Sequence, residues 1–290
     1  MMAPHPKLAE QQADITLIAP ANVQTNKRRR KQQTALIVSC RILLLIVLVA
    51  VWQLISGRFV NPLFISSPWD IVIQLKDWLL DGTLLSNTLI TMEEAMLGLI
   101  FGIVSGILAG FLLGAWQTLA RILDPFIVAL YSIPKVALAP LFIVWFGVDM
   151  PMKVILASVI VFFLVFFNTL AGVRNVDQDL IDAVLLMGGE RRDIILKVIV
   201  PSATGYVLTG LRIAIPYALI GAVIAELIAS NHGLGYLIYN AQTQFDTAGV
   251  FAALLVLTIV ASLLNAVVDF IDRKTSRWKT VMNIDRKVIP

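Results

Sequence analysis

Cysteine, histidine and charged residues are all scarce in this 290-residue sequence. It holds one cysteine, Cys40, and two histidines, His5 and His232. A single cysteine excludes an intrachain disulfide, and so few sulfur and imidazole ligands leave no set for a zinc cluster. The sequence also lacks any Gly-Lys pair, so it contains no P-loop that could hold nucleotide phosphates. We therefore expect neither a metal nor a cofactor.

Charge is low and apolar residues dominate. Only 14% of the residues are charged and 58% are hydrophobic, which is too apolar for an ordinary soluble domain. The apolar residues fall in long runs, and the alternating ten-residue segments of an outer-membrane barrel are missing. The net charge of +4 is no nucleic-acid signal, because the lysines and arginines flank the apolar runs. The composition predicts a protein that sits in a lipid bilayer.

Six apolar runs are long enough to cross a bilayer as helices. The fold class that they predict is an all-α polytopic membrane protein with six transmembrane helices. We assign residues 35–274 to this membrane domain, 1–34 to a disordered tail and 275–290 to a basic tail. The predicted spans are Leu36–Ser56, Thr88–Gly114, Ile122–Phe146, Met152–Gly172, Tyr206–Ile228 and Val250–Ile271.

The first run has two possible interpretations, because basic residues precede an apolar stretch in signal peptides as well. The run after Arg41 shows no small-x-small cleavage site, and its 26-residue lead-in is long. We therefore interpret it as an uncleaved first span.

Basic residues divide unevenly between the two sides of the membrane. Six spans put both termini on one side, and the other side holds only Arg58, Lys76 and Lys153. Cytoplasmic loops carry the excess of lysine and arginine, so we expect both termini and loop 174–201 to be cytoplasmic. The cytoplasmic set is Lys27–Lys31, Arg121, Arg174, Arg191, Arg192, Lys197, Arg273, Lys274, Arg277, Lys279, Arg286 and Lys287.

Glycine recurs every fourth residue along the second span, which places a glycine stripe on one helix face. Such a face allows close approach of another helix, and we interpret it as a packing surface. The stripe consists of Gly98, Gly102, Gly106, Gly110 and Gly114.

The third span contains Pro134, Lys135 and Pro140. Each proline removes a backbone donor, and broken helices occur in membranes where backbone is buried in protein or lines a cavity. A lysine at this depth faces the bundle interior or water. Lys135 is therefore a candidate pathway residue, with snorkelling or a structural ion pair as the alternative.

A polar stretch, Asp182–Pro201, separates two apolar runs. Asp177 or Asp179 can cap a first short helix, Gly188 ends it, and Pro201 marks a boundary after a second helix. The apolar residues of both helices fall on one side. An exposed apolar ridge of this kind indicates a docking surface, or else a helix lying on lipid headgroups.

The same stretch resembles the EAA loop of ABC importer permeases, Glu-Ala-Ala-x3-Gly-x9-Ile-x-Leu-Pro. Ala183, Gly188 and Pro201 match that pattern, and Asp182 stands for its glutamate. Val184 replaces the second alanine, and two valines, Val198 and Val200, replace Ile and Leu.

The resemblance continues through the membrane domain. The third span, IPKVALAPLFIVWFG, resembles that of nitrate/sulfonate/taurine-type permeases, and so do three later motifs. The resemblance implies a type I ABC importer permease fold in a bacterial inner membrane, with ABC ATPase subunits, an extracytoplasmic binding protein and a second permease copy as partners. The later motifs are Asn168-Thr169 with Gly172-Val173, Gly210-Leu211-Arg212-Ile213-Ala214, and Ala225-Glu226 with Gly233-Leu234-Gly235.

Roles for individual residues follow from this resemblance. It implies that Asp182, Ala183 and Gly188 shape the docking helix. Arg191 and Arg192 would meet acidic groups of the ATPase or anionic lipid. The pathway or gate residues are Pro134, Lys135, Pro140, Arg212, Glu226, Gly233 and Gly235. Within this set, Glu226 could instead neutralise Lys135 or Arg212.

Two other functional classes are alternatives to an ABC importer permease. An ion-coupled secondary carrier would use groups such as Lys135 and Glu226, but we find no inverted repeat. An intramembrane enzyme lacks support, because His232 is solitary and no Ser/His or Cys/His arrangement occurs. The expected substrate is a small anion of the sulfonate, taurine or nitrate class. A thiamine-precursor pyrimidine, riboflavin or an aromatic carboxylate is the alternative.

Overall fold

The computed structural model describes residues 33, 36–61 and 63–275, and within these it is helical with no strand. The chain divides into two compact units at Pro68. In the first, helix Leu36–Ile55 leads into a turn. The Trp52 indole N–H donates to the Ser66 carbonyl at 3.0 Å, and the Ser56 hydroxyl donates to the Ile65 carbonyl at 2.9 Å. The predicted tails lie almost wholly outside the described residues.

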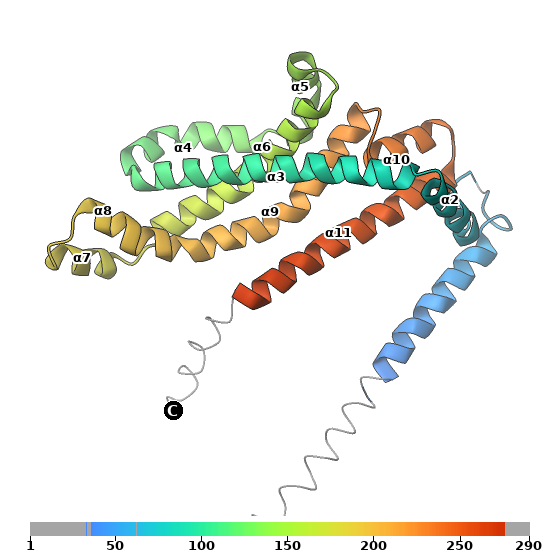
Figure 1. The fold of residues 1–290 in the computed structure, drawn as a ribbon, viewed down its shortest axis with the longest axis horizontal. Coiled ribbons are helices and arrows are strands. Elements are labelled where there is room, and N and C mark those ends of the chain that lie inside the picture. The colour runs from blue at the N-terminus through green and yellow to red at the C-terminus, as the bar shows by residue number, and fades with distance from the viewer. Residues whose placement is uncertain (1–32, 34–35, 62, 276–290) are drawn as a thin grey trace, which may run out of the picture. The chain divides into compact units, whose positions relative to one another are not determined.

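The second unit is built from long helices joined by short helices and turns (Figure 1). Five described helices of the chain are long and apolar enough to cross a membrane, or six if one bent pair counts as a span. The all-α polytopic fold is therefore confirmed. The elements are α2 Pro68–Leu80, α3 Thr83–Ala115, α4 Gln117–Ser132, a 3-10 helix Lys135–Leu138, α5 Ala139–Phe146, α6 Met150–Arg174, α7 Gln178–Leu186, α8 Arg191–Asp193, a π-helix Ile194–Ile199, α9 Val200–Ile228, α10 Leu234–Thr243 and α11 Thr247–Thr275.

The glycine stripe of α3 packs against α6, as predicted (Figure 1). A Cβ atom added at Gly102, Gly106 or Gly110 would lie only 2.6–2.9 Å from atoms of α6. Glycine is therefore required for the two backbones to lie this close. The stripe sets the spacing of the central helix pair.

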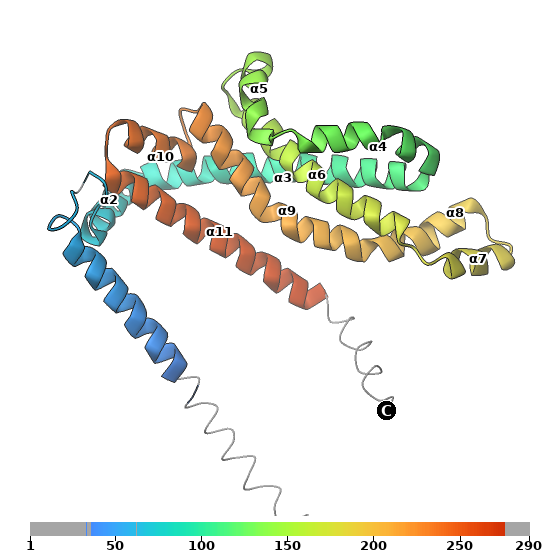
Figure 2. The ribbon, with the colours of Figure 1, turned by 180° about the vertical axis from the view of Figure 1, so that it is seen from behind.

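Helix α6 lies between α3 and α9 in both views (Figures 1 and 2). Its buried Val161 and Val165 contact Leu99 of α3 and Ala214 and Ala218 of α9. Small residues on α9 allow the same close approach on this second side of α6. The three helices form the core that positions both ends of the unit.

The predicted third span is broken rather than merely kinked. Helix α4 and the helical stretch that ends at Phe146 meet at 86°. Ile133 is extended (φ −66°, ψ 127°), because the ring of the following Pro134 disfavours the helical conformation. Pro125, in contrast, lies inside α4. A proline alone therefore does not decide where this chain bends.

Candidate functional site

Loop 174–201 begins with a capped helix at one end of the second unit. The Asp177 carboxylate accepts a hydrogen bond from the Asp179 N–H at 3.0 Å, so Asp177 is the cap of α7. The Asp182 carboxylate accepts a hydrogen bond from the Gln178 side-chain amide at 3.2 Å. Both Asp182 and Ala183 are exposed. Their side chains are free to meet a partner.

Two glycines end α7 in a Schellman motif. The Gly188 N–H donates to the Leu185 carbonyl at 3.0 Å, and the Gly189 N–H donates to the Val184 carbonyl at 2.9 Å. Gly188 has φ +76°, a left-handed conformation that favours glycine. The end of α7 lies where the Gly188 motif predicts it.

The apolar ridge of α7 is exposed at its tip. Leu186 and Met187 are 90% and 86% exposed, and Leu180 and Leu185 are about half exposed. No residue of α7 is buried. Apolar side chains presented this fully to solvent indicate a contact surface for another molecule.

The second arm of the loop starts with a capping box formed by Glu190 and Asp193. The Glu190 N–H donates to the Asp193 carboxylate at 3.1 Å, and that carboxylate also pairs with Lys197 at 2.7 Å. Arg191 and Arg192 are exposed beside this box.

The sequence predicted a helix boundary at Pro201, and this prediction is wrong. The second helix of the loop does not end there. The chain stays helical from Arg191 to Ile228. Proline lacks an N–H and its ring crowds the carbonyl one turn earlier, here that of Lys197. The wider π-turn Ile194–Ile199 lies at that point and accommodates the ring. The loop therefore continues as one helix into the membrane core.

A second cluster lies buried at the other end of the unit. Glu226 of α9 accepts hydrogen bonds from the Thr91 hydroxyl and the Gly235 N–H, both at 2.7 Å. The Gly233 N–H donates to Asn87 Oδ1 at 2.7 Å, and the Leu234 N–H donates to Thr91 Oγ1 at 2.8 Å. These bonds satisfy the first backbone donors of α10 and join it to α3 and α9.

An ion pair that the sequence did not predict lies on the same face of α3. Glu94 Oε1 lies 2.6 Å from Lys153 Nζ of α6, and both side chains are buried. One feature of the sequence could have indicated a buried polar cluster here. The spacing of Asn87, Thr91 and Glu94 puts three polar residues on one face of an apolar helix. The spacing gave no indication of their partners on α6, α9 and α10.

Lys135 lies at the break after α4 and caps that helix. Its ammonium donates to the carbonyls of Tyr131, Leu130 (3.3 Å) and Ile133 (2.8 Å). It also lies 4.8 Å from the ring centre of Phe163 on α6. A cation at a helix C-terminus stabilises the free carbonyls there. Three backbone carbonyls therefore surround the Lys135 charge.

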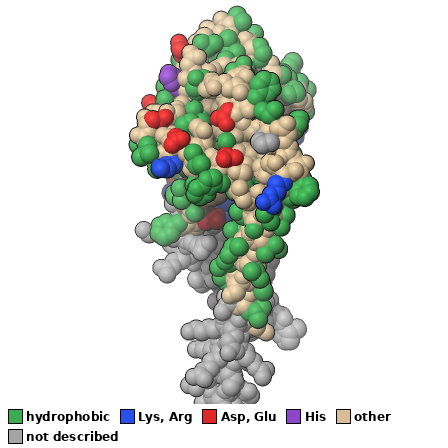
Figure 3. All heavy atoms as spheres, turned by 90° about the vertical axis from the view of Figure 1, so that its right-hand side faces the viewer, with side chains coloured by type: hydrophobic (Ala, Val, Ile, Leu, Met, Phe, Trp, Pro, Cys, Tyr) green, Lys and Arg blue, Asp and Glu red, His purple; other side chains and the backbone are tan. Residues whose placement is uncertain are grey.

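The predicted pathway residues do not form one cluster. Glu226 meets Gly233 and Gly235 in the buried junction, and its bonds go to neither Lys135 nor Arg212. Arg212 is exposed on α9, 14 residues before Glu226, roughly 21 Å along the helix. Pro134 and Pro140 flank the 3-10 helix after α4. The end that carries α2 and the α9–α10 turn exposes acidic side chains and His232 (Figure 3).

Residues 102–279 match the family described as the binding-protein-dependent transport system inner membrane component. Three curated relatives cover most of the chain. A Bacillus subtilis (strain 168) protein named for aliphatic sulfonates transport, the permease SsuC, is 34% identical over 82% of this chain and 87% of its own. The formylaminopyrimidine transport permease protein ThiX of Halalkalibacterium halodurans is 32% identical, over 82% and 94%. The taurine transport system permease protein TauC of Escherichia coli (strain K12) is 32% identical, over 81% and 87%.

A solved structure has a similar fold. A chain of the MetNI methionine ABC transporter, in an inward-facing conformation, aligns with a TM-score of 0.59. The alignment covers 69% of this chain and 97% of that chain, with 20% sequence identity. At this identity the likeness concerns the fold alone.

Proposed function

Because this chain belongs to the family of binding-protein-dependent transport system inner-membrane components, we propose that it imports a small anion of the sulfonate, taurine or nitrate class. The chain is a membrane-spanning ABC importer permease and not an enzyme. Its family works with ATPase subunits and a substrate-binding protein. The observation that carries the substrate class is the similarity to relatives named for aliphatic sulfonates and taurine.

The similarity to ThiX favours a second candidate substrate, a formylaminopyrimidine. The two candidates differ in charge: a sulfonate is anionic at neutral pH, whereas an aminopyrimidine is not. A transport assay with both compounds therefore separates them.

The proposed coupling element is loop 174–201. Leu186 and Met187 form an apolar knob that would enter a groove on the ATPase subunit. Asp182, Ala183 and Gly188 shape the helix beneath it. Arg191 and Arg192 would meet acidic groups beside the groove. The arm that follows the Gly188 turn runs from Arg191 through Pro201 into α9 as one helix, so movement of the knob would reach the membrane core through the turn and this helix.

We place the loop and both termini in the cytoplasm of a bacterial cell, and we place the spans in the inner membrane. The distribution of charge supports this orientation. Arg121, Arg174, Arg191, Arg192 and Lys197 lie at the α7–α8 end of the unit, opposite to the end that carries α2 and α10 (Figures 1 and 2). Two copies of the chain would form the pathway between them, with the break at Pro134 and Pro140 among its candidate linings.

Uptake into proteoliposomes tests the substrate class. The permease is reconstituted with its ATPase and binding-protein partners, and accumulation of taurine, an alkanesulfonate and formylaminopyrimidine is compared with ATP and with a non-hydrolysable analogue. We expect ATP-dependent accumulation of the sulfonated compounds. Accumulation of formylaminopyrimidine alone would move the assignment to the second candidate. Uptake without any ATPase would contradict both.

A further inference from the structure

We propose that a cleft beside the coupling loop binds the phosphate of an anionic phospholipid headgroup through Arg121 and Arg174. The cleft has a volume of about 800 Å³ and lies where the α3–α4 turn, the end of α6 and the start of α7 meet. This volume lies within the usual range for a site that holds a small group. The inference goes beyond substrate transport, and it rests on the proposed orientation of the protein.

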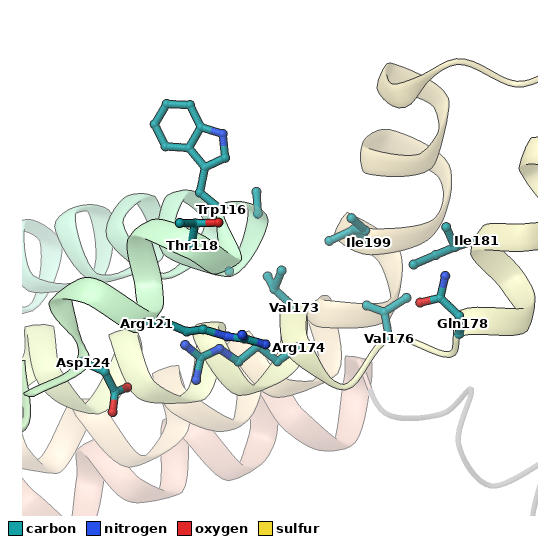
Figure 4. A pocket seen from close by; sticks show the side chains of 12 residues that line it. Trp116, Thr118, Arg121, Asp124, Val173, Arg174, Val176, Gln178, Ile181 and Ile199 are labelled. Carbon is teal, nitrogen blue, oxygen red and sulfur yellow. The ribbon is translucent and has the colours of Figure 1, made fainter.

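The two guanidinium groups come from different helices. Figure 4 shows Arg121 of α4 and Arg174 of α6 reaching toward each other across the cleft. Among the described residues, neither guanidinium forms a hydrogen bond or an ion pair. Asp124 also lines the cleft but forms an ion pair with neither arginine, and the three charged side chains of the lining have a net charge of +1. Two converging forks without a partner are suited to bind a phosphate.

The depth of the cleft favours a lipid over a soluble anion. Arg121 lies in the second turn of α4 and Arg174 is the last residue of α6, so both lie at helix ends, level with headgroups. Trp116, at the adjoining turn, is 55% exposed, and indole side chains prefer the membrane interface. Apolar Ile181 and Ile199 complete the wall. A phospholipid whose acyl chains lie in the bilayer would place its phosphate against the two arginines and its apolar part against the apolar side chains of the cleft.

The same cleft adjoins the coupling helix. Gln178 and Ile181, on the first two turns of α7, line it together with Arg174. A bound headgroup would therefore contact the docking helix directly. Its phosphate would bring the two arginines together and hold the loop at the membrane surface.

Native mass spectrometry tests the proposal with the purified full chain released from nanodiscs. The nanodiscs contain dioleoyl phosphatidylglycerol and dioleoyl phosphatidylcholine in equal amounts, and the retained lipid is identified. We compare wild type with Arg121→Gln/Arg174→Gln and with the control Arg58→Gln/Lys76→Gln, which removes the same charge from exposed positions that do not line the cleft. We expect retained phosphatidylglycerol to fall about tenfold in the first variant only, as the loss of charge-assisted hydrogen bonds implies.

Three results would overturn the proposal. An equal fall in both double variants would mean that charge alone attracts the lipid. Displacement of phosphatidylglycerol by millimolar inorganic phosphate would assign the cleft to a free anion. Unchanged lipid retention in the Arg121→Gln/Arg174→Gln variant would mean that the two arginines hold no headgroup.

A conservative variant still tests the headgroup site if the glutamine variant misfolds. Arg121→Lys/Arg174→Lys retains both charges but loses the paired donors, and we expect it to retain clearly less phosphatidylglycerol than wild type. Retention equal to wild type would contradict the headgroup site. Neither measurement requires an ATPase or a transported substrate, so its outcome is independent of the proposed transport function.

Discussion

Glu226 occupies the place at the start of α10 that a bound anion takes at other helix N-termini. Its carboxylate accepts from Gly235 N–H, while Asn87 and Thr91 accept from the two residues before. Each buried backbone donor of this turn therefore has a partner on α3 or α9. This arrangement favours a structural role for Glu226, as the link that holds α10 to the membrane core.

The buried pair Glu94–Lys153 yields the first prediction. Glu94→Ala would leave the Lys153 ammonium buried without its partner, which costs about 3 kcal/mol or more. We expect the thermal unfolding midpoint, measured in detergent by circular dichroism, to drop well below that of wild type. Glu93→Ala is the matched control, because Glu93 is the exposed neighbour.

The double variant Glu94→Leu/Lys153→Met distinguishes an unpaired charge from lost packing. Removing both charges with side chains of similar size should restore most of the lost stability. A double variant as unstable as Glu94→Ala would mean that the pair itself, and not the orphaned lysine, determines the stability of this region.

At the scale of elements, the contact between α3 and α6 was the part most open to prediction. The four-residue spacing of the glycines predicts which face of α3 makes the contact and that the two backbones lie close together. The structure confirms both features. The identity of the partner helix was not predictable, because any apolar helix with a suitable face satisfies the period. That partner is α6, which is the central helix of the unit and whose Phe166 is almost fully buried.

The second prediction concerns the contact between α3 and α6. Gly102→Val places a Cβ 2.6 Å from Val161 and 2.8 Å from the Ser158 carbonyl, so the two helices must separate. We expect a loss of about 2 kcal/mol or more in the free energy of unfolding, in the range of overpacked cores. Ser105→Val places the same side chain on an exposed face of α3 and should change stability little. Equal unfolding midpoints for the two variants would mean that α3 and α6 are not held at this spacing.

Prolines show where element-level prediction failed. Pro134 breaks the third span and Pro125 does not, although both lie in the same apolar run. Pro201 was expected to mark a boundary, yet a π-turn carries the helix through it. A proline specifies a missing donor and a crowded ring, but the neighbouring packing decides whether the helix bends or widens.

At the scale of the whole molecule, the sequence predicted the local structure of loop 174–201 better than the contacts of the proposed pathway residues. The loop is local: its caps and turns involve residues within a few positions of one another. The pathway residues depend on contacts between distant segments, and Lys135, Arg212 and Glu226 lie apart. Charge type alone therefore could not group them.

The third prediction tests the orientation of the molecule. In a Cys40→Ala background, Met187→Cys and Phe245→Cys each introduce one exposed thiol at opposite ends of the second unit. A membrane-impermeant maleimide should label position 245 in right-side-out spheroplasts and position 187 only in inside-out vesicles. The reverse labelling would invert the proposed topology.

Loop 174–201 is the proposed coupling element between the permease and an ATPase subunit. Co-purification with a candidate ATPase in lipid, followed by ATPase activity, tests it most directly. The test variant is Leu186→Asp/Met187→Asp, which removes the apolar knob without altering the Gly188 turn. The control is Leu80→Asp, which charges an equally apolar side chain, 75% exposed, on α2. We predict that wild type and the control retain the ATPase and that the test variant loses it. Retention of the ATPase by all three proteins would show that the exposed ridge of α7 is not the coupling surface.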